Sequence, residues 1–138
     1  MIVPLARFVE PAYAVMRIVV GLLFMIRGAQ KLFGAFGGEQ VPLVSLIGAA
    51  GVIEFVCGLL IMVGLLTAIA AFVASGEMAF AYFMVHSPQG GWPVNNMGEL
   101  SVLFCFIFLY IAARGAGMLS LDRALFARHS VPVRMAGT

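Results

Sequence analysis

Six charged side chains lie inside segments that are otherwise apolar enough to cross a membrane, and their chemistry stands out in this sequence. Three are basic and three are acidic, so their formal charges cancel. A charge at bilayer depth costs at least a few kcal/mol unless it is paired or wetted, so such side chains normally face the interior of a helical bundle. We therefore predict a buried charge network that binds a ligand or moves a proton. Its members are Arg17, Arg27, Lys31, Glu54, Glu77 and Glu99.

Depth along the helices suggests how these charges pair. At a rise of about 1.5 Å per residue, Lys31 and Glu99 both fall near the outer edge of the membrane, and we expect them to form one ion pair. Glu54 and Glu77 fall near the middle of their helices, and we expect the two arginines to lie on either side of them. Two other interpretations remain open. The charges either only fix the register of the helices or form an interface with a partner subunit.

Small residues share the helix faces that carry these charges. At 100° per residue, Gly21 and Gly28 fall on the charged stripe of the first apolar segment, and Gly51 and Gly58 flank Glu54 on the second. Small residues allow membrane helices to approach closely. We therefore expect the charged faces to point at neighbouring helices rather than at lipid.

The composition determines the class of protein. Of the 138 residues, 63% are hydrophobic and 10% are charged, and the mean hydropathy is +1.09; a soluble domain carries roughly 25% charged residues. We predict an all-α, polytopic membrane four-helix bundle that forms a single transmembrane domain over residues 1–138. The expected helices are residues 12–33, 43–65, 67–86 and 98–117, followed by a cytoplasmic tail at 118–138. Ser120 is placed to cap a short helix in that tail.

Basic residues near the ends of the helices predict the orientation. Arg123, Arg128 and Arg134 lie in the tail, Arg114 lies at the end of the last helix, and Arg7 precedes the first. Because cytoplasmic flanks are enriched in Lys and Arg, and an even number of crossings puts both ends on one side, we place both termini in the cytoplasm. We expect a multi-pass protein of the bacterial inner membrane.

Four sequence motifs, in order and at the right spacing, resemble those of the DoxX family. The run RGAQKLFG at 27–34 resembles the family's HG-x-x-K-L-F-G, with Arg27 in place of the commoner histidine. The other three are EFVCGLL at 54–60, which resembles E-x-x-x-G-x-L, NMGEL at 96–100, which resembles N-G-G-E-L, and GAGMLSLD at 115–122, which is similar to G-P-G-x-x-S-L-D. The resemblance covers nearly the whole chain.

The resemblance implies a redox-linked function. Some relatives are subunits of a thiosulfate:quinone oxidoreductase, and others belong to membrane oxidoreductase complexes or confer resistance to catechols and quinones. It suggests a subunit or accessory factor of a quinone-interacting membrane oxidoreductase system. A quinone or small aromatic would bind at the outer mouth near Lys31, His86, Trp92 and Glu99. Because arginine does not deprotonate usefully, a proton-transfer role is not expected at Arg27.

The remaining expectations concern cofactors, partners and alternatives. The sequence carries no haem, flavin, iron–sulfur or zinc signature and no expected metal site, so electrons would come from a partner protein, such as an oxidoreductase subunit, or from a bound cofactor that has no signature here. A quinone is a possible ligand. The lipid bilayer is the expected surrounding, a homo-oligomer is left open, and no basic run interleaved with aromatic residues indicates nucleic acid. Two alternative functions remain: a non-catalytic membrane scaffold or accessory protein, and a small proton-coupled transporter built around Glu54 and Glu77.

Overall fold

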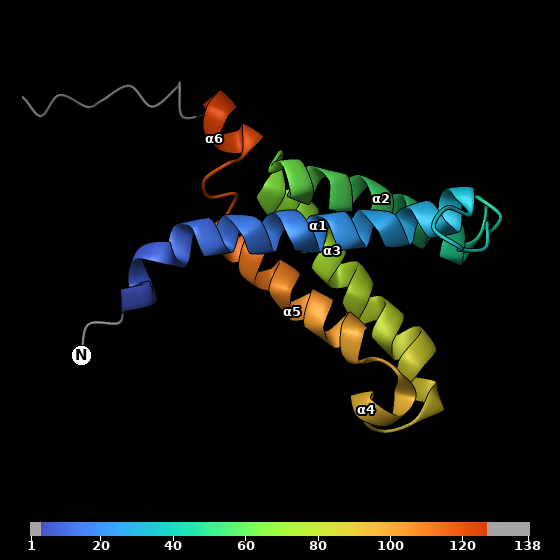
Figure 1. Ribbon diagram of the computed structural model, residues 1–138. Coiled ribbons are helices and arrows are strands. Elements are labelled where there is room, and N and C mark those ends of the chain that lie inside the picture. Colours follow the sequence, from blue (N-terminus) through green and yellow to red (C-terminus); the bar gives the residue numbers. More distant parts are fainter. Residues whose placement is uncertain (1–3, 127–138) are drawn as a thin grey trace, which may run out of the picture.

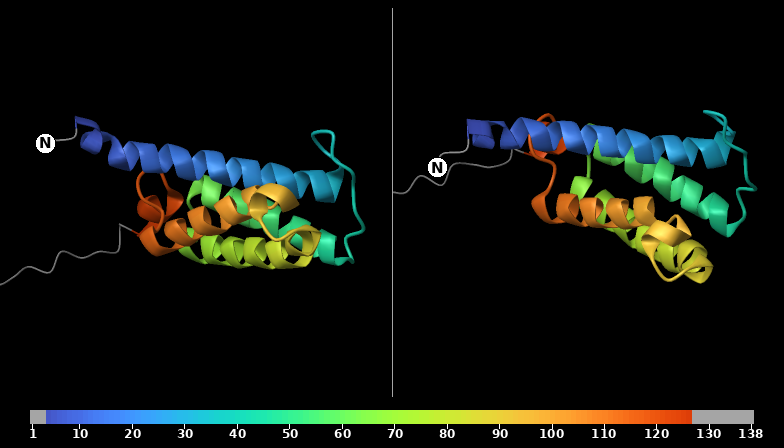
Figure 2. Two further views of the ribbon diagram at one scale, coloured as in Figure 1. Left: turned by 90° about the horizontal axis from the view of Figure 1, so that it is seen from below. Right: turned by 60° about the horizontal axis from the view of Figure 1, so that its bottom comes forward.

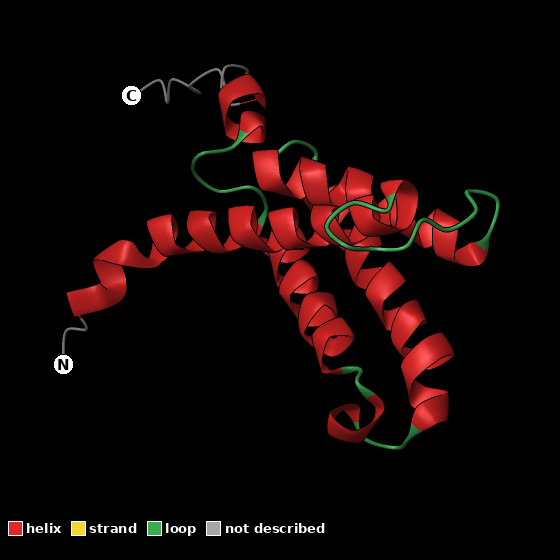
Figure 3. Ribbon diagram, turned by 45° about the vertical axis from the view of Figure 1, so that its right-hand side comes forward, coloured by secondary structure: helices red, strands yellow, loops and turns green. Residues whose placement is uncertain are grey.

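The computed structural model describes residues 4–126, and within them the regular secondary structure is helical throughout (Figure 3). The four longest helices are α1, α2, α3 and α5, and shorter helical turns lie between and beside them. In chain order the elements are η1 (Pro4–Phe8), α1 (Val9–Phe33), α2 (Leu46–Val63), α3 (Thr67–Ala81), the π-helical turn η2 (Tyr82–His86), η3 (Ser87–Gln89), α4 (Pro93–Asn96), α5 (Glu99–Arg114) and α6 (Leu121–Phe126).

Three helical stretches of the described chain are long and apolar enough to cross a membrane. They are Pro4–Phe33, Leu46–Val63 and Thr67–Gln89. α5 has 16 residues, or about 24 Å of helix at the usual rise, whereas the hydrocarbon core is about 30 Å thick. The protein is therefore an all-helical membrane protein with three candidate spans.

The long helices form two antiparallel pairs (Figure 1). α1 lies along α2, and α3 lies along α5, with a short turn between α2 and α3 joining the pairs. The pairs diverge toward what we call the loop end, where residues 34–45 and 87–98 connect the helices. At the opposite end, which we call the turn end, α1 extends beyond the other helices (Figure 2).

Glycines let the backbones of α1 and α2 touch. A Cβ atom added at Gly21 would lie 2.8 Å from the carbonyl oxygen of Gly58, and one added at Gly28 would lie 2.7 Å from that of Gly51. Real Cβ atoms do not come this close to backbone, so larger side chains would force the helices apart. The expectation that the small-residue faces meet a neighbouring helix is therefore confirmed for this pair.

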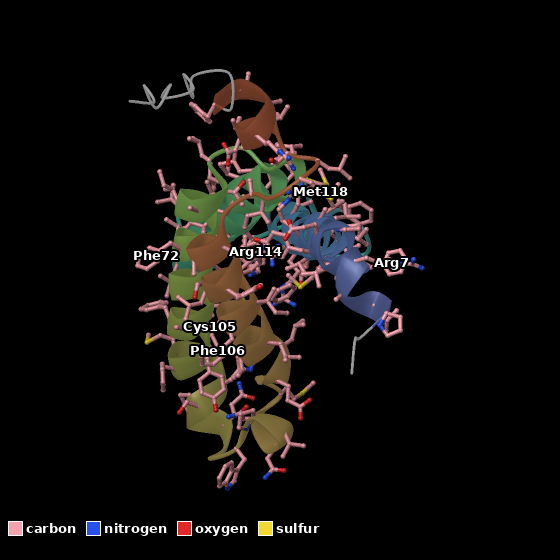
Figure 4. All side chains as sticks on the ribbon, turned by 90° about the vertical axis from the view of Figure 1, so that its left-hand side faces the viewer. Arg7, Phe72, Cys105, Phe106, Arg114 and Met118 are labelled. Carbon is pink, nitrogen blue, oxygen red and sulfur yellow. The ribbon has the colours of Figure 1, made fainter. Side chains whose placement is uncertain are left out.

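Aromatic side chains join the two helix pairs. The ring of Phe24 on α1 lies 4.7 Å from that of Phe108 and 5.5 Å from that of Phe104, measured between centroids, and both partners are on α5. All three rings are buried, together with Ile61 of α2 and Met78 of α3. The outer faces are also apolar: Phe72 and Phe106 are exposed on α3 and α5 (Figure 4), as expected for side chains that meet lipid.

The segment after α5 folds back onto the turn end. The carboxylate of Asp122 accepts hydrogen bonds from the backbone N–H groups of Leu66 and Thr67, at 2.8 and 2.9 Å, and so caps the first turn of α3. The N–H of Asp122 donates to the carbonyl of Gly64 at 2.8 Å. Ser120 Oγ accepts from the N–H of Arg123 at 3.2 Å, so the predicted cap of a short helix by Ser120 is confirmed. Residues 115–122 thus fasten α5 to the α2–α3 turn.

Candidate charge cluster and its cavity

Arg17 is fully buried but contacts no carboxylate within residues 4–126. Its side chain has 0% exposure, and its guanidinium donates to the carbonyl of Ile61 at 3.1 Å. Its other donors reach the segment that follows α5, where the carbonyls of Ala116, Met118 and Leu119 accept. The expected position of Arg17 beside Glu54 and Glu77 is therefore wrong. Ile61 lies in the last turn of α2, where its carbonyl also accepts the N–H of Gly64 at 3.2 Å and where a cation is favoured.

Lys31 forms its ion pair with Glu54 and not with Glu99. Lys31 Nζ lies 2.7 Å from Glu54 Oε1, and the two side chains have exposures of 26% and 0%. Glu99 is exposed at the first residue of α5. The two helix pairs diverge at the loop end, so the start of α5 is carried away from the end of α1 (Figure 1). The expected Lys31–Glu99 pair is wrong for this reason.

Two further charges lie close to this ion pair without joining it. Glu77 on α3 is near enough to interact electrostatically with Glu54, Lys31 and Arg27. Three buried atoms of this region have no hydrogen-bond partner within residues 4–126: Arg27 Nε, Glu54 Oε2 and Glu77 Oε2. A buried polar atom without a partner costs about 1–3 kcal/mol. The cluster of Arg27, Lys31, Glu54 and Glu77 is therefore less fully hydrogen-bonded, and contributes less to stability, than the Arg17 site.

A cavity of about 350 Å³ opens between α2 and α3 beside this cluster. Lys31 and Glu77 supply its charged groups, and its other walls are aliphatic or aromatic. These walls are formed by Leu46, Ile47, Ala49, Ala50, Ile53, Val73, Phe80, Ala81, Met84 and Val85. Several of them are also exposed on the outside of the helix pair. The cavity is therefore an apolar groove with access from the lipid side, and two charged residues are among those that line it.

The other residues expected at the mouth lie elsewhere. His86 is part of the π-helical turn, and its Nδ1 lies 3.1 Å from the carbonyl oxygen of Asn96. Trp92 is 72% exposed just before α4. Both belong, like Glu99, to the loop end of the α3–α5 pair, and neither lines the cavity. The structure thus brings Lys31 next to Glu77 rather than next to His86, Trp92 or Glu99.

Asn96 is a buried residue that the sequence analysis did not single out. Its side chain donates to the carbonyl of Gly90 at 3.0 Å and to the hydroxyl of Tyr82 at 3.2 Å, and it accepts from the N–H of Gly98 at 2.9 Å. It thereby holds the α3–α5 connection onto the end of α3. The position of Asn96 at the start of the NMGEL run was the only sequence signal that pointed to it.

Comparisons with known proteins identify the family of this chain. Residues 12–87 match the model of the DoxX family. The chain is 38% identical over 122 residues to an uncharacterized protein of Haemophilus influenzae, covering 83% of this chain and 91% of that protein. It is 31% identical over 138 residues to an uncharacterized membrane protein of Mycobacterium tuberculosis, covering 86% and 83%. No solved structure matches it. The chain therefore belongs to the DoxX family of small membrane proteins.

Proposed function

We propose that this protein is a redox-linked membrane subunit or accessory factor of a quinone-interacting oxidoreductase system, and that a lipophilic quinone binds in the α2–α3 cavity. The observation that carries the proposal is the joint placement of Lys31 and Glu77 on an otherwise apolar cavity of about 350 Å³. Ligand sites of about 300–1,000 Å³ with apolar walls and a few convergent polar groups are typical of small-molecule binding.

The chemistry of the walls suits an amphipathic ring. A quinone presents a flat apolar ring to side chains such as Phe80 and Ile53, and its oxygens need polar partners at one end of the cavity. Lys31 Nζ carries three N–H donors, of which one is engaged with Glu54. The remaining donors are available to a ring oxygen. The exposed rim of the cavity allows a ligand to enter from the bilayer, where such molecules dissolve.

The proposal includes a four-span topology with both termini in the cytoplasm of a bacterium. In this arrangement α5 and the turns on either side of it together span the membrane. The loop end and the cavity face the outside of the cell. The oxidoreductase that would exchange electrons with the quinone is a separate subunit, because the described chain supplies no redox group of its own beyond two free cysteines, Cys57 and Cys105. Such a partner would dock on an exposed face of the bundle or on the loop end.

A non-catalytic scaffold is the second candidate, and one observation favours it. Arg17 is entirely engaged with backbone carbonyls, and Lys31 is engaged with Glu54. Half of the charges therefore have a structural partner already. In a scaffold, Glu77 would stabilise the helix bundle only and the cavity would hold lipid.

Purification in a mild detergent, followed by mass spectrometry of the co-purifying lipophilic molecules and proteins, tests the proposal. We expect a quinone in roughly equimolar amount, and we expect it to be lost in Ala50→Phe, which fills the cavity from α2. Ala68→Phe is the matched control, since Ala68 is exposed on α3 and lies outside the cavity. A wild-type protein that carries only phospholipid, and does not bind added decyl-benzoquinone in nanodiscs, would favour the scaffold.

A further inference from the structure

The last described helix, α6, is fixed to the edge of the bundle through Asp122. The carboxylate accepts the N–H groups of Leu66 and Thr67 at the start of α3, and the N–H of Asp122 donates to the carbonyl of Gly64. α2, which ends directly before Gly64, has 18 residues, or about 27 Å of helix. This length is close to the thickness of the hydrocarbon core, about 30 Å. Gly64 therefore lies near one edge of that core, and the start of α6 lies at the same depth.

α6 has the direction and the exposure of a helix on the membrane surface. It lies crosswise to α1 and α2 in two views, beside the α1–α2 pair rather than in line with a long helix (Figures 1 and 3). Because α1 and α2 are candidate membrane spans, a helix crosswise to them runs along the plane of the membrane. Every residue of α6 other than Asp122 is exposed, so the bundle leaves this helix largely uncovered.

The residues of α6 are divided between two faces. At 100° per residue, Leu125 and Phe126 flank Asp122 on one face, whereas Ala124 lies on the opposite face and Arg123 lies at the edge. Asp122 bonds to the first turn of α3, from which α3 runs into the membrane. The face that Asp122 shares with Leu125 and Phe126 is therefore turned toward the membrane. These two side chains are 53% and 57% exposed, so they project beside the bundle and not into it.

This apolar face continues a surface that lipid covers. Leu66, whose N–H bonds to Asp122, is exposed, and Ile69 and Val73 are exposed after it on the same side of α3. Where α3 crosses the bilayer, these side chains meet acyl chains. An apolar face that adjoins them at the edge of the hydrocarbon core fits a lipid surface better than water.

We infer that α6 is an interfacial anchor: Leu125 and Phe126 enter the boundary between headgroups and acyl chains, and Arg123 binds the phosphate of an anionic phospholipid there. Amphipathic helices in this position bury their apolar face about 5–10 Å deep, and a guanidinium pairs with phosphate through two parallel hydrogen bonds. The start of the expected cytoplasmic tail thus belongs to the membrane surface. The anchor is separate from the proposed quinone site, since no residue of α6 lines the α2–α3 cavity.

Fluorescence quenching in nanodiscs of equal parts phosphatidylcholine and phosphatidylglycerol tests the inference. Single cysteines, Leu125→Cys or Ala124→Cys in the background Cys57→Ala with Cys105→Ala, carry a bimane label. We expect a lipid spin-labelled near the top of its acyl chain to quench the label at residue 125 at least about twofold more than the label at residue 124. Iodide in the buffer should show the opposite order. The two positions are exposed neighbours, so the labels are matched in their effect on the fold.

Other results of the quenching experiment would overturn the anchor. A label at residue 125 that iodide quenches and the spin-labelled lipid does not would place α6 in water. Protection of that label from both quenchers would mean that a protein, such as a second copy of this chain, covers the face. Equal quenching by lipid at residues 124 and 125 would contradict the assignment of the two faces.

The phosphate contact is tested separately by Arg123→Glu, with Arg123→Lys as the matched control. A carboxylate is repelled by anionic headgroups, so lipid quenching of the label at residue 125 should fall by about half in Arg123→Glu. Lysine keeps a positive charge near the surface and should preserve the quenching. Unchanged quenching in Arg123→Glu would overturn the phosphate contact and leave the apolar anchor in place.

Discussion

At the scale of single residues, Lys31 and the fully buried Glu54 form an ion pair between α1 and α2. Lys31→Met leaves the Glu54 carboxylate without its counter-charge, and we expect it to lower the free energy of unfolding by about 2–3 kcal/mol. This is less than the 3–5 kcal/mol typical of a fully buried pair, because Lys31 keeps some exposure. Thermal unfolding in detergent measures the change.

The double variant Lys31→Met with Glu54→Leu provides the control for this pair. It replaces both charges by apolar groups of similar length, and such replacements are often neutral or stabilising. We expect it to recover most of the stability that Lys31→Met loses. If the double variant is as unstable as the two single losses added together, the two side chains are not coupled.

The second prediction at this scale concerns Arg17. Lysine keeps the charge but lacks the planar fork of donors, so Arg17→Lys cannot reach carbonyls on α2 and on the segment after α5 together. We expect a loss of about 2–4 kcal/mol, because hydrogen bonds to charged groups contribute roughly 1.5–3 kcal/mol each and some of them survive. The midpoint of thermal unfolding should fall, whereas Arg7→Lys, at an exposed position, should leave it unchanged.

The sequence predicted which residues are charged and buried better than it predicted their partners. Hydropathy alone placed Arg17 and Glu54 within apolar helices, and both are fully buried. Which residue a charge pairs with depends on the register and the crossing angle of the helices. Neither can be obtained by counting residues along each helix to estimate depth. The signal for Arg17 was present in the equal seven-residue spacing of Gly21 to Gly28 and of Gly51 to Gly58. Aligned antiparallel, these spacings bring Arg17 opposite the last turn of α2.

At the scale of elements, the close packing of α1 on α2 can be tested with single methyl groups. Gly21→Ala would bring a Cβ atom to within 2.8 Å of the Gly58 carbonyl oxygen, so the helices must separate or shift. Overpacking of this kind typically costs about 1–3 kcal/mol. We expect Gly21→Ala to lower the unfolding temperature and to reduce the yield of folded protein on size-exclusion chromatography.

Gly76→Ala is the matched control for Gly21→Ala. Gly76 lies within α3, and a Cβ atom added there would meet nothing within 4 Å. Alanine is favoured over glycine in a helix by about 1 kcal/mol, so this variant should be neutral or slightly more stable. Equal destabilisation by the two substitutions would mean that backbone contact between α1 and α2 is not what requires Gly21.

The sequence located the long helices but not all of their ends. The second helix was expected from residue 43, and α2 begins at Leu46 because Ser45 Oγ accepts the N–H of Gly48 at 2.9 Å. The third was expected to residue 86, and the α-helical geometry ends at Ala81, with a π-helical turn from there to His86. The cap by Ser45 involves neighbouring residues only, so the serine marks the start of α2 in the sequence itself. The π-helical turn coincides with the hydrogen bond from Asn96 to the hydroxyl of Tyr82, and such a contact leaves no periodic pattern in the sequence.

At the scale of the whole molecule, the number of membrane crossings decides the topology. We expect single cysteines introduced as Gly37→Cys and Gly91→Cys to react from the outside of spheroplasts with a membrane-impermeant maleimide. Ala124→Cys should react only after permeabilisation. The background is Cys57→Ala with Cys105→Ala, since both native cysteines are free. Of the four longest helices, α2 and α3 lie between residues 37 and 91, and α5 lies between residues 91 and 124.

Each outcome of the labelling has a distinct meaning. Labelling of Gly91→Cys and Ala124→Cys from the same side would show that α5 does not cross. Labelling of Ala124→Cys alone from the outside would reverse the orientation that the basic tail predicts. A Cβ atom at either loop glycine meets nothing within 4 Å, so neither cysteine clashes with a neighbour. Gly37 has a φ of +73°, so Gly37→Cys strains the loop locally, whereas Gly91→Cys does not.

The cap that Asp122 places on α3 also bears on how the protein is made. Leu66, whose N–H this carboxylate accepts, leaves the ribosome 56 residues before Asp122 does. Throughout that interval the first turn of α3 is uncapped, and Arg17 has not met the carbonyls of residues 116–119. The contacts at the turn end can therefore be completed only after residues 115–122 have been made, later than all four long helices.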